Sequence, residues 1–217
     1  TGEAIVVPAT NSVRTGEIFH IEASNVTIAG LTIDGNNTLL SSGVTNPLGT
    51  DMNAAEGVAV YNDNISNLTV TNNIFKNLSY FGVTLFGASY SAPATSGHTI
   101  SQNKFQDFGT YNDVGVGNIS FWGGGVLLYN SQYAKVKDNC MENVRLGVQT
   151  GNYHIANPTP LFIPEIATNN MSVRRLGIFH NLHTVLSSPF TLSANTITAV
   201  GNANETKWSG VLLGSLS

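Results

Sequence analysis

Residues 125–147 read Gly-Val-Leu-Leu-Tyr-Asn-Ser-Gln-Tyr-Ala-Lys-Val-Lys-Asp-Asn-Cys-Met-Glu-Asn-Val-Arg-Leu-Gly, and a similar stretch starts again at Val148. This stretch holds three short β-like runs separated by turn residues, and its first and last glycines lie 22 positions apart. Self-similar units of roughly 20–50 residues are the signature of repeat proteins, in which each unit buries its apolar face against its neighbours. The stretch therefore predicts that the chain is a stack of similar units.

A glycine followed by an apolar–x–apolar triplet marks each copy of the unit. Successive marker glycines lie 22 to 43 residues apart, which a core unit of about 22 residues with insertions explains. Alternate side chains of a strand face the same way, so Val126 and Leu128 are expected to stack on their counterparts in neighbouring copies. The marker glycines are Gly57, Gly82, Gly125, Gly147, Gly177 and Gly210.

A second recurring feature is a short strand that ends in Asn and is followed by another strand. Asn and Gly tolerate a positive φ, so they suit a tight bend between two strands. Stacked Asn side chains can also hydrogen-bond to each other and to the turn backbone. Each unit is therefore expected to run strand, Asn turn, strand, Gly turn, strand and variable loop. The turn residues are Gly30, the pair Asn72 and Asn73, Asn103, Asn139, Asn169 and Asn195.

These features together resemble the right-handed parallel β-helix of the pectin-lyase-like superfamily. The Asn turn, the Gly-Val-x-Leu strand and the opening stretch Ser-Asn-Val-Thr-Ile-Ala-Gly-Leu-Thr-Ile-Asp-Gly at 24–35 carry the resemblance, which covers roughly residues 17–213. It implies an all-β, single-stranded right-handed parallel β-helix of about six to seven coils, forming one domain over residues 1–217. The superfamily contains pectate and alginate lyases, polygalacturonases, epimerases, phage tailspikes and surface proteins without known activity.

Three long insertions interrupt the repeat, at residues 36–55, 110–124 and 152–165. Loops on a stiff scaffold are where function usually lies, although these loops are equally suited to capping an apolar strip. The last strand, at 211–217, has no polar cap, so we expect further coils or another domain to follow it in a longer secreted or cell-surface protein.

The composition excludes several function classes. Charged residues make up only 10% of the chain, the formal net charge is −4, and the nine Lys and Arg residues are scattered, so nucleic-acid binding is not expected. No apolar run approaches the length of a membrane span, so membrane insertion is not expected either. The single cysteine, Cys140, allows no intrachain disulfide and no Cys-rich metal site. Neither a cofactor nor a metal is expected.

One outward-facing row of the predicted stack is aromatic. Aligning the marker glycines places Tyr61, Phe86 and Tyr129 on consecutive units, about 4.8 Å apart along the axis. Such a row suits stacking on sugar rings, because aromatic faces attract C–H-rich surfaces and Tyr adds a polar group. The row therefore predicts a polysaccharide or glycan partner, unless the insertions fold over the three rings and bury them.

Arginine residues suggest an alternative, enzymatic function. Arg145 and Arg175 align on neighbouring units and together could bind a uronate carboxylate, unless Glu142 or Asp138 pairs with them. A polysaccharide lyase would also need a base that abstracts the proton α to that carboxylate. The candidate bases are His154, His180 and Lys135.

Known hydrolase patterns of this fold are missing from the chain, which has no adjacent Asp pair to supply two facing carboxylates. Three functions therefore remain open. The first is carbohydrate binding without catalysis, the second is a polysaccharide lyase or a related polysaccharide-degrading enzyme such as a glycoside hydrolase, and the third is a passive stalk or adhesin segment.

Overall fold

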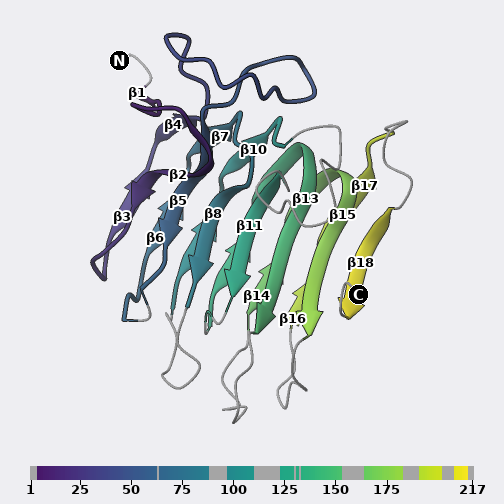
Figure 1. The fold of residues 1–217 in the computed structure, drawn as a ribbon. Coiled ribbons are helices and arrows are strands. Elements are labelled where there is room, and N and C mark those ends of the chain that lie inside the picture. The colour runs from purple at the N-terminus through teal and green to yellow at the C-terminus, as the bar shows by residue number, and fades with distance from the viewer. Residues whose placement is uncertain are drawn as a thin grey trace.

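A computed structural model describes residues 4–62, 64–87, 97–109, 123–129, 131, 133–152, 164–182, 191–201 and 208–214. All regular elements in these ranges are β-strands, and they lie side by side in a long stack with the N- and C-termini towards opposite ends (Figure 1). Every pairing between strands is parallel, as the sequence predicts. The strands form three rows.

The first row is a separate six-stranded sheet. Five of its strands precede the Asn bend of their unit and β3 precedes Gly30, and the central residues Val70 and Ile100 are fully buried. The strands are β3 (Thr27–Ala29), β6 (Thr69–Thr71), β9 (Thr99–Ser101), β12 (Lys135–Lys137), β14 (Glu165–Ala167) and β16 (Thr191–Ser193).

The second and third rows belong to one twelve-stranded sheet that folds back on itself and is nearly closed. The strands β13 (Cys140–Asn152) and β15 (Asn170–Leu182) run through both rows and join them. The second row also contains β1 (Ala4–Val6), β4 (Leu31–Asp34), β7 (Ile74–Lys76), β10 (Lys104–Gln106) and β17 (Thr196–Ala199). The third row also contains β2 (Ser12–His20), β5 (Ala54–Val60), β8 (Phe81–Phe86), β11 (Gly124–Tyr129) and β18 (Ser209–Gly214).

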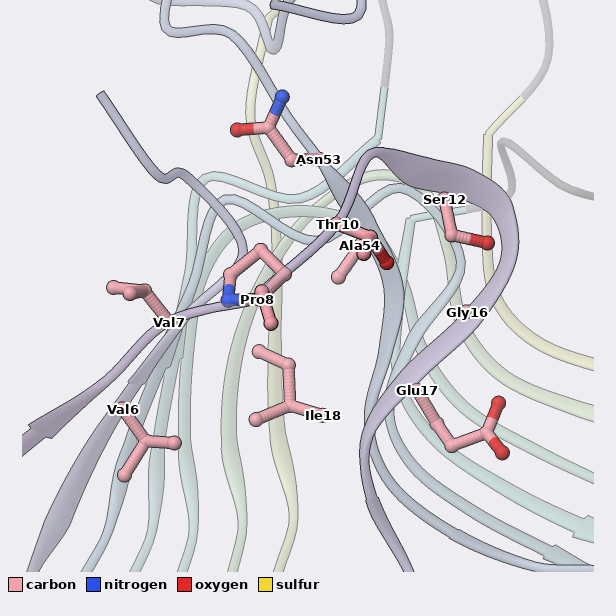
Figure 2. A pocket seen from close by; sticks show the side chains of 11 residues that line it. Val6, Val7, Pro8, Thr10, Ser12, Gly16, Glu17, Ile18, Asn53 and Ala54 are labelled. Atoms are coloured by element: carbon pink, nitrogen blue, oxygen red, sulfur yellow. The ribbon is translucent and has the colours of Figure 1, made fainter. Parts of the chain in front are cut away.

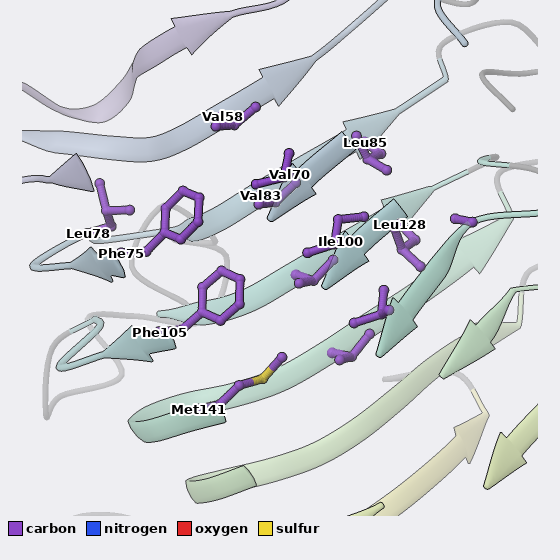
Figure 3. Close-up of a cluster of buried hydrophobic side chains, with 14 of the residues drawn as sticks. Val58, Val70, Phe75, Leu78, Val83, Leu85, Ile100, Phe105, Leu128 and Met141 are labelled. Carbon is purple, nitrogen blue, oxygen red and sulfur yellow. The ribbon is translucent and has the colours of Figure 1, made fainter. Parts of the chain in front are cut away.

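The architecture is thus all-β and parallel, and it is compatible with the predicted β-helix. Its apolar core lies between the three rows, where successive units place similar side chains on top of each other (Figure 3). Phe75 and Phe105 stack with their ring centroids 4.9 Å apart and their planes 9° from parallel. Val58 and Val83 are register partners and are both fully buried.

The predicted Asn ladder is present. The side chain of Asn139 donates to Oδ1 of Asn169 at 2.9 Å and to the carbonyl of Ile100 at 3.0 Å. It also accepts from Asn103 at 3.0 and 3.1 Å. The ladder runs through Asn73, Asn103, Asn139, Asn169 and Asn195.

The conformational reason given for these Asn residues is nevertheless wrong at most turns. The residue with positive φ is the one before the ladder Asn, as at Gln102, Asp138 and Thr168. The ladder Asn is therefore required for its amide, which satisfies the backbone of two units, rather than for tolerance of a left-handed backbone.

The marker glycines do not form turns either. They lie inside the third-row strands, and none of them has a positive φ. A Cβ on Gly82 would lie 2.5 Å from the ring of Phe105, and one on Gly147 would lie 2.4 Å from the carbonyl oxygen of Gly177. These positions require glycine because neighbouring units approach each other too closely for any side chain.

Candidate functional site: a pocket over the third row

The predicted outward rows have the predicted register. Tyr129 pairs with Phe86, Leu127 pairs with Thr84, and Leu127 also pairs with Gln149 on the other side. The ring centroids are 6.2 Å apart for Tyr61 and Phe86 and 5.6 Å apart for Phe86 and Tyr129. These distances exceed the strand spacing because the rings are tilted by 50° and 46°.

Exposure falls along this aromatic row. Tyr61 is 41% exposed, Phe86 is half-buried, and Tyr129 is only 6% exposed. The hydroxyl of Tyr129 accepts a hydrogen bond of 2.8 Å from Nε2 of Gln149. Phe81 and Leu127 belong to a second buried apolar cluster that includes Tyr129. The Tyr61 end of the row therefore presents an aromatic ring to solvent.

A cavity of about 370 Å³ lies at this exposed end. It is walled by aromatic and aliphatic side chains and contains a small number of polar groups. Three strands of the third row contribute most of the wall, and β2 supplies the rim. The lining residues are Arg14, Thr15, Ala55, Glu56, Tyr61, Tyr80, Thr84, Phe86 and Leu127.

Glu56 is the buried acid of this pocket. Only 2% of the residue is exposed, and its carboxylate accepts hydrogen bonds from the hydroxyls of Thr84 and Tyr61. Burial raises the pKa of Glu56, and the charge of Glu17 raises it further, whereas the two hydroxyls and His20 lower it. Burial and the Glu56 carboxylate raise the pKa of Tyr61, so its hydroxyl remains a hydrogen-bond donor.

The sequence-based analysis missed Glu56. Strict alternation would put it on the same face as Val58, but the chain changes face at Gly57, so that Glu56 points outward with its register partner Phe81. The available signal was its position directly before a marker glycine. Phe81, Leu146 and Leu176 occupy that position in other units, so a carboxylate there stands out.

A second acidic side chain lies next to Glu56. Glu17 of β2 is its register partner, and Oε1 of Glu17 is 2.8 Å from Nδ1 of His20. Nε2 of His20 is 3.7 Å from Glu22, and the imidazole lies 6.2 Å from the ring of Tyr61. Glu17, His20 and Glu22 are not among the residues that line the pocket, and the β2 residues in its wall are Arg14 and Thr15.

A smaller cavity of about 240 Å³ lies between β1 and β2 (Figure 2). Val6, Pro8 and Ile18 gather on one side of it, and Glu17 lies on the other. It has no aromatic wall and contains no fully buried acid. The larger pocket over the third row is accordingly the better candidate site.

The arginines lie further along the third row. Arg145 is 3% exposed and Arg175 is half-buried, and the register shifts between them because β15 has an extra residue there. That residue, Arg174, is buried and donates to the carbonyl groups of Asn143 and Phe108. The acids expected to pair with the arginines have other partners. Glu142 lies 2.8 Å from Lys104, and Asp138 accepts from Thr168.

Two of the three candidate bases, His180 and Lys135, lie apart from these arginines. His180 is 2% exposed and bonded to Thr150, and burial lowers its pKa to about 4. It lies five residues from Arg175 on the same strand, roughly 16 Å away. Lys135 is exposed on β12, in the separate six-stranded sheet. His154 lies outside the described residues.

Comparisons with known proteins identify no relative: no family model, no curated protein and no solved structure matches this chain. In the part of the chain that the structure describes, no helix is long and apolar enough to cross a membrane. Within the same residues, no three His, Cys, Asp or Glu side chains gather in a way that could hold a metal ion. The function has to be argued from the pocket itself.

Proposed function

We propose that this chain is an extracellular carbohydrate-binding domain, secreted or held at the cell surface, whose partner is a polysaccharide or glycan. We also propose that it is a right-handed parallel β-helix of the pectin-lyase-like type with about six to seven coils. The parallel rows and the Asn ladder support this architecture. The observation that carries the function is the pocket in which the exposed ring of Tyr61 stands beside Phe86, Glu56 and Thr84.

This combination of groups suits a sugar. A sugar ring has C–H-rich faces that pack on aromatic rings, and hydroxyl groups at its edge that need hydrogen-bond partners. Tyr61 and Phe86 supply the aromatic faces, while Glu56 and Thr84 supply the polar contacts. The cavity of about 370 Å³ lies in the size range of small-ligand pockets, which are mostly apolar with a few placed polar groups.

Binding to immobilised neutral, cationic and anionic polysaccharides tests the proposal, followed by titration of any glycan that binds. Tyr61→Ala should weaken binding about tenfold, because stacking and burial of the ring are both lost. Tyr133→Ala is the matched control, because Tyr133 is 44% exposed and lies outside the pocket. Its binding should equal that of the unchanged protein.

Two results would refute carbohydrate binding at this site. If no glycan binds, the passive stalk or adhesin segment becomes the better account of the chain. If both tyrosine variants lose binding equally, the glycan does not use the pocket. Release of unsaturated product from a uronate polymer would instead establish the lyase alternative.

A further inference from the structure

Within the described residues, Glu56 is a buried carboxylate that forms no ion pair. Among the described residues, the groups that bond to it are the neutral hydroxyls of Thr84 and Tyr61. The ion pairs within this part of the chain involve other acids, namely Glu17, Glu22, Asp34 and Glu142. Acidic side chains are rarely this buried unless a positive charge accompanies them. A carboxylate has about four acceptor positions, so those not used by the two hydroxyls remain for a ligand.

The surroundings of Glu56 favour a positively charged group. The rings of Tyr61, Tyr80 and Phe86 line the same pocket, and aromatic faces attract cations within about 6 Å. On the β2 side, Glu17 is the register partner of Glu56. The other charged or titratable groups on that side are Arg14 at the rim, His20 and Glu22. The pocket wall holds the Glu56 carboxylate and the Arg14 guanidinium, and the Glu17 carboxylate lies close enough to Glu56 to raise its pKa.

The geometry points to a glycan that carries free amino groups as the ligand of this pocket, with a sugar ammonium bound by the Glu56 carboxylate and the sugar ring packed on Tyr61. This inference rests on the proposed carbohydrate binding and names the class of sugar. A neutral sugar would leave the buried charge uncompensated, and a uronate would be repelled by it. An amino sugar supplies the missing cation at the place where the aromatic wall can hold the ring.

The test compares two oligosaccharides that differ only in acetylation. Glucosamine oligomers and the same oligomers after N-acetylation are titrated into the unchanged protein by calorimetry at several pH values from mildly acidic to neutral, because the amine must be protonated while Glu56, whose pKa burial raises, must be ionised. The amino form should bind about tenfold more tightly, because a charge-assisted hydrogen bond is roughly twice as strong as a neutral one. This arm needs no substitution, so it does not depend on how any variant folds.

Two variants then locate the effect. Glu56→Gln keeps the shape of the side chain and should abolish the preference for the amino form over the acetylated form. Glu22→Gln is the control for general surface attraction, because the side chain of Glu22 is 81% exposed, and it should retain the preference. Thermal unfolding verifies that both variants are folded.

Each outcome has a separate meaning. Equal binding of the two oligomers, or a preference that survives Glu56→Gln, overturns the amino-sugar inference but leaves carbohydrate binding standing. Stronger binding of a galacturonate oligomer than of the amino form overturns it as well. Failure of every glycan to bind refutes the proposed function itself.

Discussion

Replacing Asn139 by Ala should strongly destabilise the protein, because Asn139 lies inside the Asn ladder with a bonded neighbour on each side. Asn139 is 2% exposed. Its side-chain amide donates to the carbonyl of Ile100 and to Oδ1 of Asn169, and its oxygen accepts from the backbone and side-chain nitrogens of Asn103. An amide has two hydrogens and two acceptor positions, so at most four full bonds are lost. At about 0.5–1.5 kcal/mol each, the expected loss is roughly 2–6 kcal/mol in the free energy of unfolding.

Urea unfolding measures this loss, provided that the slope with denaturant is unchanged between variants. Asn195→Ala is the matched control, because Asn195 ends the described ladder, is half-buried and makes three side-chain bonds, to Ile166 and Asn169. Water can replace part of what Asn195 loses, so this variant should lose about half as much. Equal losses in the two variants, or a loss below about 1 kcal/mol for Asn139→Ala, would refute the role given to the ladder.

Three further predictions concern single positions. Burial lowers the pKa of His98 from 6.5 to about 4, so the unfolded chain binds a proton at a higher pH than the folded protein does. The free energy of unfolding should therefore fall by about 3 kcal/mol as pH drops between these two values. Urea unfolding of His98→Gln should lack this part of the pH slope, and an unchanged slope contradicts the prediction. Gly147→Ala should lose about 1–3 kcal/mol through overpacking. Gly210→Ala, with its nearest contact at 3.4 Å, should melt almost like the unchanged protein, and equal melting of the two contradicts the close-approach argument. Burial raises the pKa of Glu56, so the free energy of unfolding should fall as pH rises from 4.5 through the raised pKa. Glu56→Gln should lack this fall and should melt at a higher temperature than the unchanged protein at neutral pH. Coincident melting curves for the two proteins would contradict this prediction.

Much of the fold could be predicted because stacking repeats the same chemistry in every unit. Aligning the marker glycines gave the register of the third row residue by residue, including the pairing of Tyr129 with Phe86. The Asn ladder followed from the second recurring feature, the short strand that ends in Asn. Both predictions use positions at which each unit meets its neighbour, where a departure from the pattern would leave a void or an unpaired amide.

The corners of the units were less predictable. Left-handed residues recur every five positions, at Asn67, Asn72 and Asn77 in one unit, but at Tyr133 and Asp138 in another. Left-handed residues such as Tyr133, Thr168 and Ala194 are not what local propensity selects for this conformation, so contacts between stacked units decide the backbone there. A sequence pattern built on Asn and Gly therefore finds some corners and misses others.

The candidate site depended on a change of face that no periodicity reports. Glu56 points outward because the strand changes face at Gly57, whereas simple alternation would place it in the core with Val58. The fall in exposure from Tyr61 to Tyr129 was also not predictable, because it depends on which side chains pack against each ring, as Leu127 packs in one buried cluster with Tyr129. The aromatic row was found from the sequence, while the buried acid beside it needed the structure.

The most direct test of the account is a crystal structure of the protein with a bound glucosamine oligomer. The account predicts a sugar ring against Tyr61 and an amino group within hydrogen-bond distance of the Glu56 carboxylate. A bound oligomer whose sugars lie elsewhere on the stack, with no contact to Tyr61 or Glu56, would contradict the assignment of this pocket as the glycan site.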